Sequence, residues 1–255
     1  MTEYIEENKT LMEYLKALNM PSIKEYIEDI EKQAYAEQWT YRQFLSKLME
    51  AEVHRRAENR KAQRLRQAGF PEMKYLQELE RTELPAECRT ILPELETLNF
   101  IREGRNIVMY GNPGTGKTHT AIGLGIKACM EGYSVFFVTI PQLLVQIREA
   151  QSARTLHKLQ YRFLAYDLVI CDEFGYVSFD KEGGEQIFNH LSLRAGKKAI
   201  ITTTNLPFTR WDEIIKDKAL CSALVDRLCY KAFLVNMSGA SYRVKETRKM
   251  FNNTL

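Results

Sequence analysis

Residues 111–118 have the types and spacing of a loop that binds phosphate groups. They read Gly-Asn-Pro-Gly-Thr-Gly-Lys-Thr and follow a short apolar run. Glycines let backbone N–H groups surround a phosphate, and the start of the following helix adds the positive end of its dipole. Lys117 would reach the β- and γ-phosphates, and the Thr118 hydroxyl would complete the coordination of Mg²⁺. We therefore expect ATP and Mg²⁺ as cofactors, held by Gly111, Asn112, Pro113, Gly114, Thr115, Gly116, Lys117, Thr118 and His119.

A second apolar run, at 168–171, ends in two adjacent carboxylates, Asp172 and Glu173. Asp172 at the strand tip is placed to hold Mg²⁺ opposite Thr118. Glu173 points to a different side and can accept a proton from an attacking water. The alternative is a strand that ends in two solvated carboxylates. The phosphate loop upstream favours the catalytic interpretation.

Two further polar residues are candidates for the same reaction. Asn205 follows the apolar run at 199–202, and a neutral amide beside Glu173 can orient the attacking water without repelling phosphates. Its alternative role is to start a turn before Leu206 and Pro207. Arg227 cannot easily reach the phosphates of its own subunit, but in an oligomer it can enter a neighbour's site as an arginine finger. Alternatively, Arg227 is a surface cation that pairs with Asp226 or a nearby carboxylate.

The elements that must position these residues alternate between strands and helices. Short apolar runs at 107–109, 135–138, 168–171, 199–202 and 232–235 predict strands buried on both faces of a parallel sheet, separated by helices. This order predicts an α/β, doubly wound domain with its ligand at the carboxyl ends of the strands. It also argues against a chance match of the phosphate loop in a glycine-rich turn.

The first third of the chain is expected to be helical. Apolar residues at helical spacing predict one helix that stops at Pro21, a second over 22–38 and a third from Thr40 to about Gly69. Thr40 and Gln43 have the spacing of a capping box. We expect an all-helical domain over 1–70, a linker over 71–98 and the ATPase domain over 99–255.

Composition excludes several classes of protein. With 45% hydrophobic and 27% charged residues, the chain is typical of a globular protein and not of a disordered one. It has no apolar stretch long enough to cross a membrane and no basic-then-apolar leader. The five cysteines are scattered without a C-x-x-C pair, which predicts free thiols, core packing for Cys129 and Cys171, and a cytosolic location.

The net charge of +3 is unevenly distributed, because a basic stretch follows an acidic start. Residues at 56, 60 and 64 share one face of the third helix, where cations can neutralise successive DNA phosphates. The alternative is a solvated helix face, since Glu50, Glu52 and Glu58 are interspersed. The candidate DNA-binding residues are Arg55, Arg56, Arg60, Lys61, Arg64 and Arg66.

The sequences of several segments resemble those of the IstB family of AAA+ ATPases, the helper proteins encoded beside the transposase in a class of bacterial insertion sequences. These segments are 111–119, 172–176, 181–183, 203–208 and 239–243. The family is related to DnaC-type helicase loaders, and the resemblance covers essentially the whole chain.

The resemblance implies a five-stranded parallel sheet in the order 5-1-4-3-2, without the large helical lid found in many relatives. It also implies ATP-dependent assembly on duplex DNA, a homo-oligomer with ATP sites shared between subunits, and a partner transposase encoded by the same element. Arg227 becomes the preferred finger by this likeness, and Arg243 could contact nucleotide. A helicase loader and a nucleotide-gated DNA scaffold with incidental hydrolysis are the alternative functions.

Overall fold

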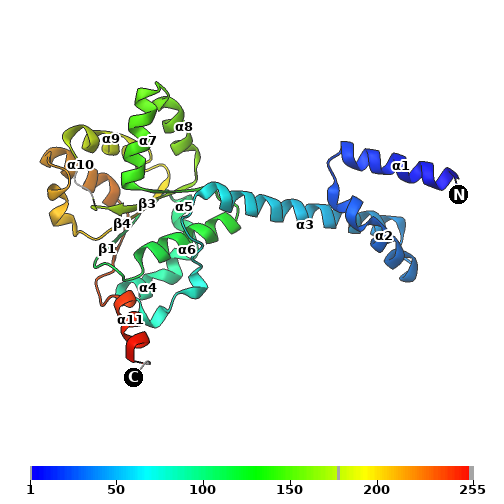
Figure 1. Ribbon diagram of the computed structural model, residues 1–255, viewed down its shortest axis with the longest axis horizontal. Coiled ribbons are helices and arrows are strands. Elements are labelled where there is room, and N and C mark those ends of the chain that lie inside the picture. The colour runs from blue at the N-terminus through cyan, green and yellow to red at the C-terminus, as the bar shows by residue number, and fades with distance from the viewer. Residues whose placement is uncertain (1, 177–178, 253–255) are drawn as a thin grey trace. The chain divides into compact units, whose positions relative to one another are not determined.

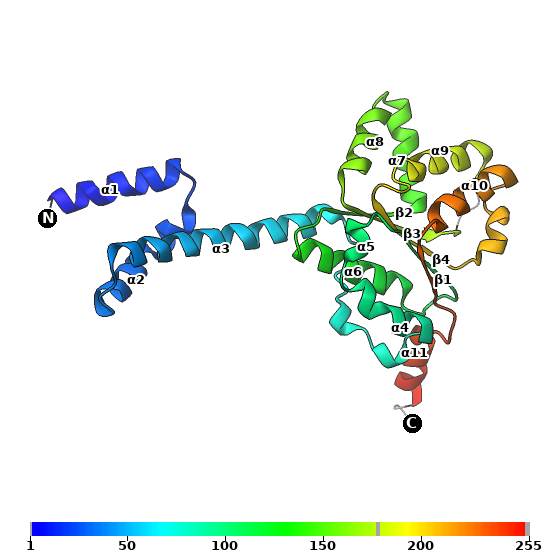
Figure 2. The ribbon, with the colours of Figure 1, turned by 180° about the vertical axis from the view of Figure 1, so that it is seen from behind.

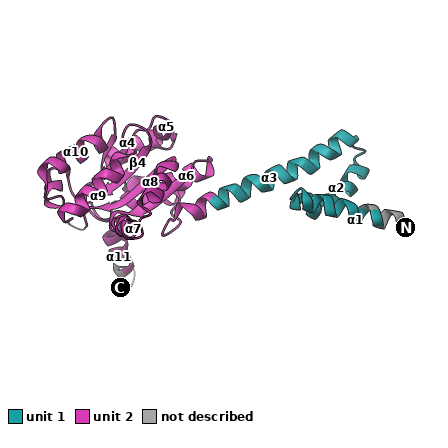
Figure 3. Cartoon of the chain, turned by 90° about the horizontal axis from the view of Figure 1, so that it is seen from above, with its two compact units in different colours: residues 1–63 teal, residues 64–255 magenta. Residues whose placement is uncertain are grey.

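The computed structural model describes residues 2–176 and 179–252, which form two compact units. Unit 1 comprises Met1–Gln63 and unit 2 comprises Arg64–Leu255 (Figure 3). Unit 1 contains α1 (Thr2–Ala17), α2 (Pro21–Ala36) and most of α3 (Tyr41–Ala68), so the three predicted helices are present. The last turn of α3 belongs to unit 2, where Ala68 is fully buried.

Unit 1 has a small apolar core formed by Leu15, Ile23, Ile27 and Leu48. The predicted capping box starts α3: the Thr40 N–H donates to Gln43 Oε1 at 2.8 Å, and the Gln43 N–H donates back to Thr40 Oγ1 at 3.3 Å. These bonds satisfy two backbone donors that the first turn of a helix leaves free. Local sequence signals are therefore sufficient to place this helix start.

The five predicted strands form one parallel sheet in unit 2. Its order is β2-β3-β4-β1-β5, which is the expected 5-1-4-3-2 order read from the opposite edge. The strands are β1 (Ile107–Tyr110), β2 (Val135–Thr139), β3 (Leu168–Phe174), β4 (Ala199–Thr204) and β5 (Phe233–Asn236). The central strands β1, β3 and β4 are almost entirely buried, because helices cover both faces of the sheet.

Two layers of helices cover the sheet (Figures 1 and 2). One face carries α4 (Ala86–Leu95), α5 (Asn99–Arg102) and α6 (Lys117–Met130), which share a core with the strands. The other face carries α7 (Ile140–Ser152), α8 (Leu156–Ala165), α9 (Lys181–Ser192) and α10 (Lys218–Cys229). The remaining elements are η1 (Leu76–Glu78), η2 (Arg81–Glu83), η3 (Phe208–Glu213) and α11 (Tyr242–Asn252).

Residues 71–98 do not behave as the linker that we expected. They form η1, η2 and α4, and Leu76, Leu84 and Leu92 from this segment are buried in the core of unit 2. A Cβ atom at Gly123 of α6 would lie 2.6 Å from Leu76 Cδ2, so the missing side chain allows this close approach. Pro85 and Pro93 suggested a linker, but the segment buries enough apolar surface to pack. The boundary between the units therefore lies at 63/64, inside α3.

The cysteines are reduced, as their scattered spacing predicted, and all but the partly exposed Cys229 are buried. Cys129 and Cys171 are fully buried, and burial raises the pKa of the Cys171 thiol to about 12. All five cysteines are free thiols.

Within the described ranges, the structure contains no helix of the length and apolarity needed to cross a bilayer.

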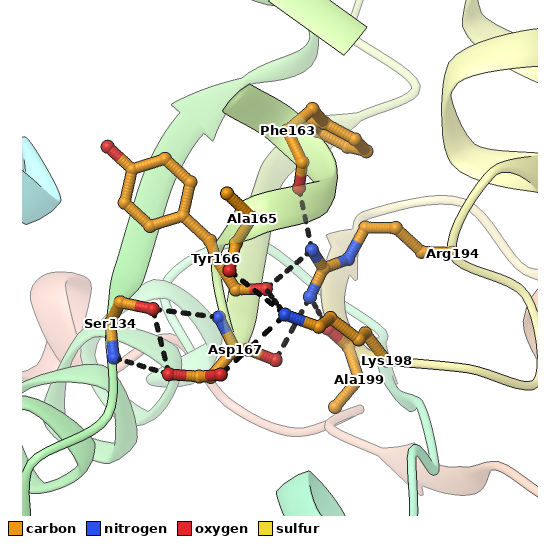
Figure 4. Close-up of polar contacts among 8 residues, drawn as sticks. All are labelled: Ser134, Phe163, Ala165, Tyr166, Asp167, Arg194, Lys198 and Ala199. Atoms are coloured by element: carbon orange, nitrogen blue, oxygen red, sulfur yellow. Dashed lines mark hydrogen bonds and ion pairs between the residues drawn. The ribbon is translucent and has the colours of Figure 1, made fainter. Parts of the chain in front are cut away.

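Arg194 is a fully buried cation that joins two connections at the amino-terminal edge of the sheet (Figure 4). Its two terminal nitrogens donate to four backbone carbonyls, those of Phe163 (2.7 Å), Tyr166 (2.8 Å), Asp167 (3.0 Å) and Ala199 (3.0 Å). Burial lowers the pKa of Arg194 to about 10, so the guanidinium stays charged at neutral pH. The side chain thus ties the turn before β3 to the start of β4.

We expect Arg194→Lys to destabilise unit 2 by about 2–4 kcal/mol, because one ammonium cannot reach four carbonyls that a planar fork reaches at once. The measurement is the midpoint of denaturant unfolding followed by circular dichroism. Lys198→Met is the matched control, since its half-exposed ammonium also binds carbonyls of this turn, at 2.9 and 3.2 Å. Equal midpoints for the two variants would contradict a central role for Arg194.

Candidate nucleotide site

The phosphate loop connects the end of β1 to the start of α6. Gly111 has φ +139°, and a Cβ atom there would lie 2.5 Å from the backbone of Met237 and Ser238. Gly116, the residue before α6, has φ +94°. Both positions therefore require glycine, and the resulting turn places the first N–H groups of α6 at the loop. The expected strand, loop and helix are all present.

Lys117 is buried in this loop, with 7% of its surface exposed. Its ammonium donates to the carbonyls of Gly111 (2.7 Å) and Asn112 (2.6 Å). Burial lowers the pKa of Lys117 to about 8, although the nearby Asp172 carboxylate opposes the shift. Phosphate groups would favour the charged ammonium in the same way, so Lys117 is suited to bind them.

Thr118 and Asp172 meet although they lie 54 residues apart. The Thr118 hydroxyl donates to Asp172 Oδ1 at 3.0 Å, and Asp172 is 4% exposed. A hydroxyl and a carboxylate are hard oxygen ligands of the kind Mg²⁺ accepts alongside phosphate oxygens. The described residues contain no group of three or more His, Cys, Asp or Glu side chains that could hold a metal alone. The donor set therefore fits Mg²⁺ bound together with a nucleotide.

Glu173 and Asn205 line the same pocket as the phosphate loop, a cavity of about 350 Å³. Glu173 is partly exposed and has φ +61°, a left-handed conformation that is uncommon for residues other than glycine. Its N–H donates to Thr203 Oγ1 at 3.2 Å. The structure thus brings Glu173, the predicted base, and Asn205, the residue predicted to orient the attacking water, into one cavity with Lys117.

The pocket has a wall that the motifs did not indicate. The segment 74–84, which we expected to be part of a linker, contributes Lys74, Glu78, Leu79, Glu80, Glu83 and Leu84 to its lining. His119 anchors this wall, because its Nε2 lies 2.9 Å from the Tyr75 carbonyl oxygen. His119 also lines the pocket, so it stays a candidate contact for the nucleotide. Gly123 has no side chain and therefore leaves room for Leu76, and it is the sequence feature that could have indicated this wall.

The segment before and within α11 closes another side of the loop. The Tyr242 N–H donates to the Gly114 carbonyl at 2.9 Å, and Asn112 Nδ2 donates to the Gly239 carbonyl at 3.2 Å. Tyr242 and Arg243 line the pocket. Arg243 is thus placed where it could meet a nucleotide.

Arg227 lies outside the pocket, on α10. Its Nη1 donates to Ser192 Oγ at 2.6 Å, and its guanidinium carbon lies 4.4 Å from the centre of the Phe188 ring. Among the described residues, it forms no ion pair with Asp226, the partner suggested as an alternative. The side chain remains exposed, as an arginine that acts on another subunit must be.

The candidate DNA-binding residues differ in their contacts. Arg55 and Lys61 pair with Glu25 and Glu58, and Arg56 pairs with the buried Glu52 at 2.8 Å and also donates to the Asn19 carbonyl. Within unit 2, Arg64 donates to the Cys129 carbonyl at 2.8 Å. The side chains of Arg60 and Arg66 are exposed and have no hydrogen bond or ion pair to any described residue.

Comparison with known proteins identifies relatives along nearly the whole chain. An insertion sequence IS21 ATP-binding protein of Pseudomonas aeruginosa is 35% identical over 236 residues, covering 92% of this chain and 89% of that protein. An insertion sequence IS5376 ATP-binding protein of Geobacillus stearothermophilus is 32% identical over 236 residues, covering 92% and 94%.

Solved structures have a similar fold over about 70% of the chain. The replication initiator DnaA bound to AMPPCP and single-stranded DNA has a TM-score of 0.56 at 21% identity, covering 70% of this chain and 55% of that one. DnaI has a TM-score of 0.56 at 15% identity, covering 69% and 94%. The model of the family of IstB-like ATP binding proteins matches residues 13–250. The chain therefore belongs to the IstB-like ATP-binding family and is an ATPase with the AAA+ fold.

Proposed function

We propose that the protein uses ATP to assemble on duplex DNA and to assist the transposase encoded by the same insertion sequence. The observation that carries the proposal is the convergence of Lys117, Glu173 and Asn205 on one pocket, where Thr118 is hydrogen-bonded to Asp172. Its relatives are named as ATP-binding proteins of insertion sequences, which supports a role beside a transposase. We place this activity in the bacterial cytosol, where ATP and DNA are both available.

The pocket residues have distinct parts in the proposed hydrolysis. Lys117 binds the β- and γ-phosphates and favours their negative charge. Glu173 accepts the proton of the attacking water, and Asn205, which follows the neighbouring strand β4, orients that water. Thr118 and Asp172 would hold Mg²⁺, which neutralises phosphate charge when bound. The 74–84 wall excludes bulk water from one side of the cavity.

Arg227 is proposed to act on the ATP bound by a neighbouring subunit. It is an exposed cation outside its own pocket, and Ser192 and Phe188 hold its guanidinium in a defined position. A guanidinium placed against the transferred phosphate offsets charge that develops in the transition state. ATP hydrolysis would then depend on assembly, so the nucleotide would control how long the oligomer remains on DNA.

The residues proposed to bind DNA phosphates most directly are Arg60 in unit 1 and Arg66 in unit 2. Both are exposed cations without a partner in the described part of the chain, so neither must break an internal contact first. Arg56 is less available to bind DNA, because turning its side chain toward a DNA phosphate would leave the buried Glu52 without its counter-ion. Contacts to phosphates would give binding that depends on salt and little on sequence.

We expect Arg60→Ala and Arg66→Ala each to weaken duplex DNA binding and to lower the slope of log affinity against log salt by about 1. Fluorescence anisotropy of a labelled duplex at several salt concentrations measures both quantities. Arg42→Ala is the control, since Arg42 is an exposed arginine of the same helix outside the basic stretch. Slopes unchanged from the Arg42→Ala protein would remove these residues from the DNA-binding surface.

A further inference from the structure

An irregularity in the sheet lies between the two catalytic carboxylates and their neighbouring strand. Cys171 of β3 pairs with Thr202 of β4, and Phe174 pairs with Thr204. Two residues of β3, Asp172 and Glu173, therefore face a single residue of β4, which is Thr203. This is a β-bulge, a feature that redirects side chains and recurs beside active sites.

The hydroxyl of Thr203 contacts both of the residues opposite it. Thr203 Oγ1 donates to Asp172 Oδ1 and accepts the Glu173 N–H at 3.2 Å. A hydroxyl group has one donor and two acceptor sites, so it can make both bonds at once. Thr203 is 2% exposed, and water therefore cannot easily substitute for it.

These two bonds hold the left-handed backbone of Glu173 and the orientation of the Asp172 carboxylate, neither of which a regular strand would maintain. Glu173 has φ +61°, which a non-glycine residue keeps only where its surroundings hold it. Asp172 Oδ1 receives the Thr118 hydroxyl as well as that of Thr203, so the orientation of the carboxylate is defined from two sides. One hydroxyl is thus linked both to the magnesium-binding carboxylate and to the backbone of the base.

We propose that Thr203 is the positioning residue for both carboxylates, setting the direction of Asp172 through its side chain and of Glu173 through its backbone N–H. This inference rests on the proposed roles of Asp172 and Glu173. Residues that orient metal ligands in this way commonly change activity or metal affinity by about 10–100-fold when they are replaced.

The neighbouring Thr202 supplies a matched control. It is fully buried in the same strand, and its hydroxyl has no hydrogen-bond partner among the described residues. Thr202→Val should therefore preserve ATPase activity and folding. Thr203→Val makes the same chemical change one residue away, and Thr203→Ser retains the hydroxyl.

We expect Thr203→Val to lower kcat by about 10–100-fold and to raise the Mg²⁺ concentration needed for half-maximal activity, with KM for ATP changed less than about threefold. Thr203→Ser should remain within about threefold of the parent protein. A kcat for Thr203→Val equal to that of Thr202→Val would overturn the proposal. If Thr203→Val does not fold, Thr203→Ala and Thr203→Ser give the same comparison, because they differ only in the hydroxyl.

A second measurement does not depend on catalysis. Hydrogen exchange of the Glu173 amide, followed by NMR without nucleotide or Mg²⁺, should become at least about tenfold faster in Thr203→Val and remain slow in Thr203→Ser. Unchanged exchange in Thr203→Val would contradict the backbone contact. Glu173→Gln, tested in parallel, separates the two proposals. If it retains parent turnover, the base assignment fails, whereas loss of turnover there with full activity in Thr203→Val refutes only the role of Thr203.

Discussion

Lys117→Ala is expected to weaken ATP binding by roughly 100-fold or more, because a charge-assisted contact to phosphate contributes about 1.5–3 kcal/mol and the Lys117 ammonium would make more than one with bound ATP. Lys117 is the first residue of α6, and its side chain is hydrogen-bonded to the loop carbonyls of Gly111 and Asn112. Within the described part of the pocket, the other lysine is Lys74, which belongs to the 74–84 wall and not to the phosphate loop.

The expected loss is a loss of binding and not of folding. Burial lowers the pKa of Lys117 to about 8, which means that the fold does not favour the charged form of this side chain. Removing it should therefore leave the thermal unfolding temperature unchanged or raise it. Titration calorimetry with ATP and Mg²⁺ measures the affinity. Lys127→Ala is the control, since Lys127 lies on the same helix, is partly exposed and pairs with Glu131 at 2.7 Å.

An affinity for ATP in Lys117→Ala that matches Lys127→Ala would show that the loop binds phosphate through its backbone alone. A folded Lys117→Ala protein without measurable binding would support the assigned role. The melting curves of both variants are needed to distinguish this result from simple unfolding.

Glu173→Gln should keep ATP binding within about threefold but lower kcat by roughly 10²–10⁴-fold, approximately the contribution of a general base. Glutamine has nearly the same shape as glutamate, so the pocket and the left-handed backbone at this position are retained. The amide cannot accept a proton at neutral pH. Bound ATP would then persist, and the proposed assembly on DNA should become long-lived.

Two measurements check this expectation: phosphate release with and without duplex DNA, and the size of the ATP-bound complex by gel filtration. Glu80→Gln is the matched control, because Glu80 lines the same pocket from the 74–84 wall but is not on a strand. Parent-like turnover in Glu173→Gln would show that another group activates the water. Slow turnover in the parent protein with or without DNA would instead favour the nucleotide-gated scaffold.

The local motifs are sufficient to predict most of the site. The loop at 111–118, the strand that ends in Asp172 and Glu173, and Asn205 after β4 are each defined by a few consecutive residues. The hydrophobic runs also predict all five strands, and parallel strands place their carboxyl ends at one edge. The meeting of Thr118 and Asp172 therefore follows from the order of these motifs along the chain.

Other features depend on contacts between segments distant in the chain. The prolines at 85 and 93 suggested a linker, but packing of Leu76 against Gly123 draws 74–84 into the nucleotide pocket. The sequence did not rank the cations of the basic stretch of α3, but internal partners occupy Arg56 and Arg64, whereas the exposed side chains of Arg60 and Arg66 have no partner among the described residues. Neither the packing of 74–84 nor the pairing of these arginines follows from residue spacing along the chain, because each depends on which side chains of distant segments lie opposite.

By itself, the sequence determined that this protein binds nucleotide in a parallel α/β domain, because the required backbone turns and strand ends are encoded by neighbouring residues. The tertiary structure alone decided what surrounds that nucleotide site: the 74–84 wall, the α11 contacts and the Thr203 hydroxyl between two carboxylates. The physical reason is the range of the interactions. Chain geometry operates over a few residues, whereas a hydrogen bond such as that from the Glu173 N–H to Thr203 spans 30 residues and forms only when β3 and β4 pair.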